Sequence, residues 1–66
     1  MPLISIRLVA GRSTEELRAL VKGVSDATSE ALGVPVERVG VHILELEPRL
    51  VGRGGALLSD IQDVAG

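Results

Sequence analysis

Proline at position 2 is the residue of this 66-residue chain with the most distinctive chemistry. Removal of Met1 would leave a secondary amine at the amino terminus. Because α-amino groups titrate near ~7.7–8.0, a modest fall in pKa would leave a free base at neutral pH. Few other side chains offer acid–base or nucleophilic chemistry, since the chain has no Cys and no Tyr, and His42 is its single His. Taken alone, a proline after Met1 is common and usually has no catalytic function. The rest of the sequence must therefore show whether Pro2 is catalytic.

Three arginines are candidates for holding an anionic substrate: Arg12, Arg38 and Arg53. A guanidinium suits a carboxylate because it offers two parallel donors, although most surface arginines are only solvated. His42 is better explained as a hydrogen-bonded packing residue, and no second His or Cys accompanies it. We therefore expect no metal site and no cofactor. The glycines at 52, 54 and 55 lack the Lys-Ser/Thr pair of a phosphate loop, which argues against nucleotide binding.

The composition excludes several other functions. The chain has no Phe, Tyr or Trp on which bases could stack, and its net charge is −2, so we expect no nucleic-acid partner. The apolar stretch from Leu3 to Ala10 contains Arg7 and is far shorter than a membrane span. No membrane partner is expected, and a cytoplasmic location follows.

The small size of the chain predicts self-association. We expect one domain over residues 1–66, and a chain of this length buries only about 60% of the surface it exposes when unfolded. Neither disulfides nor a metal can supplement such a core, because Cys is absent and His is single. A hydrophobic content of 45% adds apolar surface that subunit contacts would cover.

The hydrophobic pattern predicts how these residues are positioned. Residues Leu3–Val9 alternate as a strand, with Ile4, Ile6 and Leu8 on one face. Ser13 and Glu16 have the spacing of a capping box, so a helix should run from about Thr14 to Leu32 and end at Gly33 before Pro35. Its expected sheet-facing stripe is Leu17, Leu20, Val21, Val24, Ala27, Ala31 and Leu32.

A second strand is expected over Val39–Leu46, and a strand that follows a long helix should pair in parallel with the first. The fold class is therefore α/β, built from a β-α-β subunit. A glycine-rich hairpin or loop should follow over Leu50–Gly55, and then a weakly amphipathic tail over Ala56–Val64. One helix can cover only one face of the sheet, so the other face should pack on another subunit.

Several segments together resemble the 4-oxalocrotonate tautomerase family of short subunits. They occur in the family's order over nearly the whole chain: Met1-Pro2, Gly11-Arg12-Ser13, Leu32-Gly33-Val34-Pro35, Val39 and Val41, Glu45, and Gly52-x-Gly54-Gly55.

The resemblance implies dimers of β-α-β subunits, commonly three dimers to a hexamer, with active sites at subunit boundaries. Pro2 would be the catalytic amine, which moves a proton between the hydroxyl oxygen and a distant carbon of a 2-hydroxydienoate. Arg12 would bind a substrate carboxylate. The other expected substrate-binding residues are Leu3, Val9, Arg38, Val51 and Arg53.

Two positions depart from the family pattern. Gly40 stands where the isomerases carry a second arginine, and Val51 stands where they carry a phenylalanine that keeps the pocket apolar. Loss of one such charged donor can cost ~10²–10³ in rate. Arg53 or Arg38 could replace the missing cation, and we favour Arg53 because glycines flank it. An arginine at position 53 also disfavours the dehalogenase and hydratase activities of relatives that use a glutamate there.

Two functions remain open. The chain is expected to be a homo-oligomeric tautomerase that acts on 2-hydroxydienoates or enolpyruvate-type acids. Alternatively, it is a subunit of a hetero-oligomer whose partner chain supplies the missing arginine, with little or no activity alone.

Overall fold

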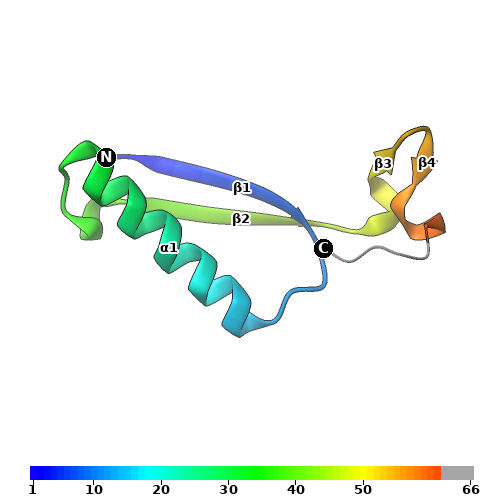
Figure 1. Cartoon of the computed structure of the whole chain (residues 1–66), viewed down its shortest axis with the longest axis horizontal. Helices are drawn as coiled ribbons and strands as arrows, with labels where there is room; N and C mark the ends of the chain where they lie inside the picture. Colours follow the sequence, from blue (N-terminus) through cyan, green and yellow to red (C-terminus); the bar gives the residue numbers. More distant parts are fainter. Residues whose placement is uncertain (62–66) are drawn as a thin grey trace.

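The computed structural model describes residues 1–61, in which two parallel strands are joined by one long helix. Strand β1 (Leu3–Val9) pairs with β2 (Gly40–Leu46), from Leu3 opposite Gly40 to Val9 opposite Leu46. Helix α1 (Thr14–Leu32) connects them and lies along one face of this sheet (Figure 1). The predicted β-α-β arrangement is confirmed, and the second strand begins one residue later than predicted because Val39 closes a short 3-10 turn, η1 (Val36–Arg38).

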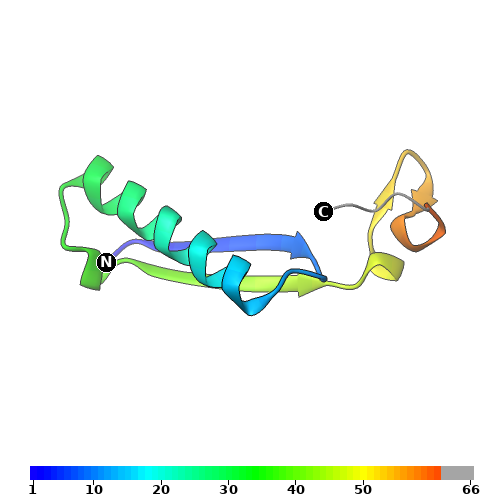
Figure 2. The same ribbon diagram turned by 60° about the horizontal axis from the view of Figure 1, so that its bottom comes forward.

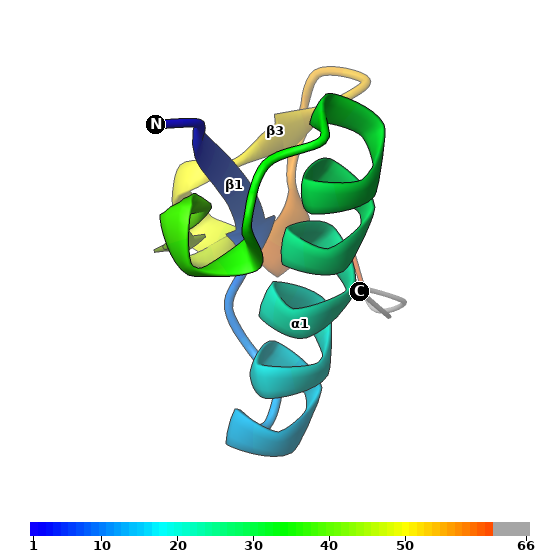
Figure 3. The same cartoon turned by 90° about the vertical axis from the view of Figure 1, so that its left-hand side faces the viewer.

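The two faces of the sheet differ in what covers them. Ile4, Ile6 and Leu8 of β1 are half-buried beneath α1, as are Val41 and Ile43 of β2. The opposite face carries Leu3, Ser5, Arg7 and Val9 beside Gly40, His42, Leu44 and Leu46. Seen along the strands, α1 lies on one side of the sheet only (Figure 3). We call the other side the open face.

The predicted capping box begins α1. The Ser13 hydroxyl accepts a hydrogen bond from the Glu16 backbone N–H at 3.1 Å, and the Glu16 carboxylate accepts one from the Ser13 backbone N–H at 3.1 Å. These bonds satisfy two amide donors that the first helical turn leaves unpaired. Gly33 ends the helix with φ 66°, a left-handed conformation that suits glycine.

The predicted helix stripe is right over its first half and wrong over its second. Leu17, Leu20, Val21 and Val24 are half-buried, whereas Ala27, Ala31 and Leu32 are exposed. Thr28 is half-buried where Ala27 was expected to be. Residues four apart lie on the same face of a helix, so Thr28 follows Val24 on the face toward the sheet. Leu32, at the helix end, is 60% exposed. The last turn of α1 therefore presents apolar side chains to its surroundings.

The residues after β2 form a separate small unit at one end of the molecule (Figures 1 and 2). It contains the 3-10 turn η2 (Pro48–Leu50), the antiparallel strands β3 (Gly52–Arg53) and β4 (Ala56–Leu57), and the 3-10 turn η3 (Leu58–Asp60). Gly54 and Gly55 form the turn with φ 61° and 84°, as a tight two-residue hairpin requires. The predicted hairpin is confirmed from Gly52 on, while Leu50 belongs to η2. Residues 62–64 of the predicted tail lie outside the described residues.

The chain buries little of itself. Leu58, 3% exposed, is the one buried residue in the described part. The accessible surface is 5000 Å², against roughly 4000 Å² for a compact monomer of this mass. The radius of gyration is 14.7 Å, against about 11 Å for a compact chain of this length. The elongated molecule, with extents of 43 × 23 × 14 Å, therefore lacks the central core of a typical small domain.

Candidate functional site

The structure places Pro2 at one end of the sheet, immediately before β1. The Pro2 carbonyl accepts a hydrogen bond of 2.9 Å from the Gly40 backbone N–H, which fixes the first residues of the chain against the start of β2. Met1 is 92% exposed. Its removal would therefore leave the Pro2 nitrogen at an accessible end of the sheet, beside the open face.

Two other expected site residues lie at the same end as Pro2. Leu3 begins β1 and lies directly opposite Gly40 on the open face, where it is 66% exposed. Arg38 ends η1, two residues before Gly40, and is exposed. Arg38 makes no ion pair within residues 1–61. Pro2, Leu3, Arg38 and Gly40 therefore form one local group, which we call the proline end.

Arg12 and Val9 lie at the other end of β1. Val9 ends the strand, and Arg12 precedes the helix cap, where its guanidinium forms an ion pair of 3.3 Å with Glu16. The pKa of the Glu16 carboxyl is lowered below its ordinary value, mainly by the hydrogen bonds from the backbone and side chain of Ser13 and further by Arg12. The carboxylate is thus held ionised beside Arg12, so the capping box also orients the expected anion-binding residue.

Val51 and Arg53 form a third group, beyond the end of β2. Val51 is half-buried between η2 and β3, and its carbonyl accepts a hydrogen bond from the Leu58 N–H at 2.8 Å. Arg53 pairs with Ala56 in the hairpin, is exposed and makes no ion pair with the described residues. Arg53 and Gly40 lie at opposite ends of β2, so Arg53 does not approach Gly40 of its own chain.

One chain does not bring the expected site residues together. A strand rises about 3.3 Å per residue, so the length of β1 separates Pro2 from Arg12 by roughly 20 Å. A catalytic amine must come within about 3–3.5 Å of the atom that it deprotonates, and a small acid cannot span the remaining distance. A site that uses both residues must therefore combine Pro2 of one chain with Arg12 of another.

A hydrogen bond on the open face did not follow from the sequence. The Ser5 hydroxyl lies 2.6 Å from Nε2 of His42, its neighbour across the two strands. A hydrogen-bonded packing role was predicted for His42, but its partner could not be, because the register of the strands decides which residue lies opposite. This pair adds a second polar position, beside Arg7, to a face that is otherwise apolar.

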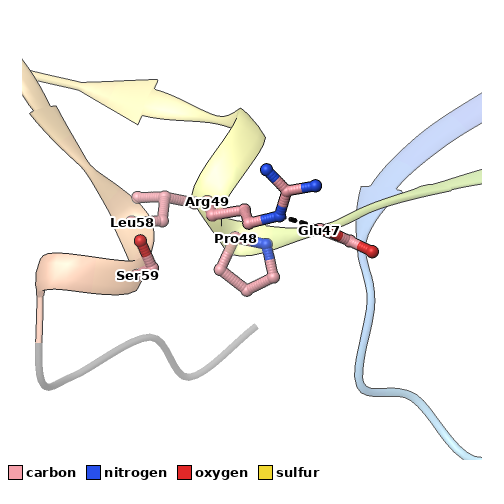
Figure 4. A pocket seen from close by; sticks show the side chains of 5 residues that line it. All are labelled: Glu47, Pro48, Arg49, Leu58 and Ser59. Carbon is pink, nitrogen blue, oxygen red and sulfur yellow. Dashed lines mark hydrogen bonds and ion pairs between the residues drawn. The ribbon is translucent and has the colours of Figure 1, made fainter.

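A shallow pocket of about 440 Å³ lies between η2 and η3 (Figure 4). Pro48 and Leu58 provide its apolar surface, and Glu47, Arg49 and Ser59 line the rest. Glu47 and Arg49 form an ion pair of 2.8 Å with each other. The pocket contains none of the expected site residues.

Within residues 1–61, no three His, Cys, Asp or Glu residues are grouped as metal ligands would be. None of the helices in this part of the chain has the long apolar run needed to cross a membrane.

Comparison with known proteins identifies close relatives. A family model described as tautomerase enzyme matches residues 2–61. A probable tautomerase of Lactiplantibacillus plantarum is 45% identical over 60 residues, which cover 91% of this chain and 94% of that protein.

Solved structures show the same similarity. A 4-oxalocrotonate tautomerase isozyme from Methylibium petroleiphilum superposes with a TM-score of 0.84 at 36% identity, covering 88% of this chain and 94% of the other. A chain of the heterohexamer 4-oxalocrotonate tautomerase from Chloroflexus aurantiacus superposes with a TM-score of 0.88 at 32% identity, covering 94% and 100%. The similarity therefore extends over nearly the full length of each protein.

Proposed function

This chain belongs to the tautomerase family, and from that premise we propose that it is an isomerase that moves a proton in 2-hydroxydienoate or enolpyruvate-type acids. The observation that carries the proposal is the family match itself, which begins at Pro2 and extends to residue 61. Pro2 is the general base and acid, and Arg12 is the carboxylate anchor. Substrate contacts come from Leu3, Val9, Arg38, Val51 and Arg53.

In the proposed reaction, the Pro2 nitrogen accepts the proton of the substrate's 2-hydroxyl group. The oxygen becomes a carbonyl as its electrons move into the conjugated chain, and the protonated amine then returns the proton to a carbon of that chain. The product is the 2-oxo isomer, so no atom or electron is gained or lost. A positioned group that transfers a proton in this way contributes typically ~10²–10⁴ in rate.

The separation of Pro2 and Arg12 supports a site shared between chains. Strands β1 and β2 form a two-stranded sheet, so each has an unpaired edge among the described residues. Antiparallel pairing of two copies about a two-fold axis would bring the proline end of one copy toward Val9 and Arg12 of the other. Self-association into dimers, and of dimers into a hexamer, is accordingly part of the proposal. So is a single tautomerase-like domain over residues 1–66.

A second candidate function follows from Gly40, which offers no cation where the family pattern has one. The chain would then be one subunit of a hetero-oligomer whose partner supplies that arginine. The similarity to a chain of a heterohexamer favours this alternative. Activity of the chain expressed alone distinguishes the two functions.

The decisive experiment follows enol ketonisation by ultraviolet absorbance, with 2-hydroxymuconate and an analogue in which a methyl group replaces the distal carboxylate. The protein is expressed alone, and its intact mass must show that Met1 is absent. We expect a rate well above that of buffer. The matched control is the same chain with Met1 retained, whose Pro2 nitrogen is an amide without a basic lone pair and which should be inactive.

A processed chain that is no faster than buffer with both enols would contradict the homo-oligomeric tautomerase and favour the partner-dependent subunit. Equal rates with and without Met1 would rule out Pro2 as the base. Pro2→Ala is a less stringent control, because it leaves a primary amine in the same place.

A further inference from the structure

Leu3 occupies the space above Gly40 at the proline end. A Cβ atom added to Gly40 would lie 3.0 Å from Cδ1 of Leu3 and 3.3 Å from Cε of Met1. Real Cβ atoms rarely come so close to a neighbour, so a side chain at position 40 would require the end of the Leu3 side chain to shift by a few tenths of an ångström. After removal of Met1, Leu3 remains as the side chain that covers this part of β2.

This leucine lies within one residue of the proposed catalytic nitrogen. Leu3 follows Pro2 directly, and the hydrogen bond from the Gly40 N–H to the Pro2 carbonyl holds the three residues together. In the single chain the Leu3 side chain is 66% exposed, and its methyl groups face outward beside the Pro2 nitrogen. A substrate whose hydroxyl reaches the Pro2 nitrogen therefore meets hydrocarbon on the adjoining surface.

The charges nearest this surface come from η1, where Glu37 and Arg38 are adjacent and opposite in sign. The next pair on the open face is Ser5 beside His42. Neither Leu3 nor Gly40 can donate a side-chain hydrogen bond to a carboxylate. Placing an ionised carboxylate against such a surface costs free energy, while placing an apolar group there is favourable.

We propose that Leu3, packed over Gly40, makes the site selective for enol acids with one carboxylate and an apolar remainder, in preference to dicarboxylates. The inference rests on the proposed function, and it assigns the substrate class of the same site. The single carboxylate binds Arg12 of another copy, and the apolar remainder lies on Leu3 of the copy that supplies Pro2.

The test compares kcat/KM for the two enols named above, which differ only in a methyl group against a carboxylate. We expect the processed chain to favour the methyl analogue by about tenfold or more, the scale of discrimination that an apolar pocket achieves. Leu3→Ala should reduce this ratio by about tenfold, mainly through the methyl analogue. Leu3→Met, which conserves apolar volume, should retain the ratio.

Leu32→Ala is the matched control. It removes the same side chain from the last turn of α1, where Leu32 is 60% exposed, and it should leave the ratio unchanged. Circular dichroism and gel filtration confirm that each variant is folded and assembled. If Leu3→Ala does not fold, the parent's own ratio still tests the selectivity.

Preference for 2-hydroxymuconate by the parent chain would overturn the selectivity and leave the proposed function standing, because turnover is observed. An equal effect of Leu3→Ala on both enols would also overturn it. Absence of turnover with either enol would overturn the proposed function, and the selectivity with it.

Discussion

At the scale of single residues, Arg12 combines a structural and a proposed functional role. Its ion pair with Glu16 holds the guanidinium at the helix cap. In the proposed function, Arg12 binds the substrate carboxylate. Arg12→Ala should lower kcat/KM by roughly 10–100-fold, mainly by raising KM, because a hydrogen bond to a charged group contributes about 1.5–3 kcal/mol. Steady-state kinetics with the preferred enol measure the effect.

Arg18→Ala is the control for Arg12. Arg18 lies in the first half of α1 and, like Arg12, forms an ion pair with a glutamate, Glu15, at 3.1 Å, but no part of the proposed site includes it. Its removal should leave kcat and KM unchanged. Equal losses in the two variants would show that Arg12 acts only on the helix.

At the scale of elements, the capping box at the start of α1 makes the stability of the fold depend on pH. The hydrogen bonds from Ser13 lower the pKa of Glu16 below its ordinary value of 4.5 in the folded chain. A group with a lowered folded pKa stabilises the fold fully above its unfolded pKa, and this contribution disappears as pH falls through the folded pKa. Glu16→Gln should therefore lose stability at neutral pH and show a smaller drop between about pH 7 and pH 3 than the parent chain.

Urea unfolding followed by circular dichroism, at a fixed protein concentration, gives the free energy of unfolding at pH 7 and at pH 3. Glu30→Gln is a suitable control, since Glu30 lies in the last turns of the same helix and takes no part in its capping box. This variant should show the same drop in stability as the parent chain. An equal acid dependence in Glu16→Gln and the parent chain would contradict the prediction.

Most elements could be predicted from the sequence because their causes are local. The alternation in β1, the capping box at Ser13 and the turn at Gly33 each depend on neighbouring residues, and the structure has all three. The exposure of Ala27, Ala31 and Leu32 could not be predicted in this way. It depends on where α1 lies over the sheet, which no pattern within the helix determines. The Ser5–His42 pair was missed for a similar reason, since it depends on strand register.

At the scale of the whole molecule, one chain by itself buries too little apolar surface to stabilise its fold well. An accessible surface of 5000 Å² and a single buried residue in the described part leave the apolar residues of the open face without a partner. We expect thermal unfolding to depend on concentration, with Tm rising as the protein is concentrated, because association stabilises the folded state by mass action. Gel filtration with light scattering should give a multiple of 6.9 kDa. A Tm independent of concentration, together with the mass of one chain, would contradict this expectation.

The site was harder to predict than the fold, because its geometry depends on how the chains associate. Pro2 and Arg12 were predicted from the sequence, and because roughly 20 Å separates them along β1, a site that uses both needs two chains. A pattern in one chain contains no information on which copy supplies which residue. The identities of the candidate residues could therefore be read from the sequence, and their arrangement in a site could not.

The unpaired edges of β1 and β2 have a consequence for the chain before it assembles. Each edge offers a row of backbone donors and acceptors, and within these strands Arg7 and Glu45 are the only residues with a full charge. Sparsely charged edges are templates for further strand addition, which native proteins normally block. Chains that are made faster than they assemble are therefore at risk of aggregation, so the rate of synthesis has to stay matched to the rate at which copies meet.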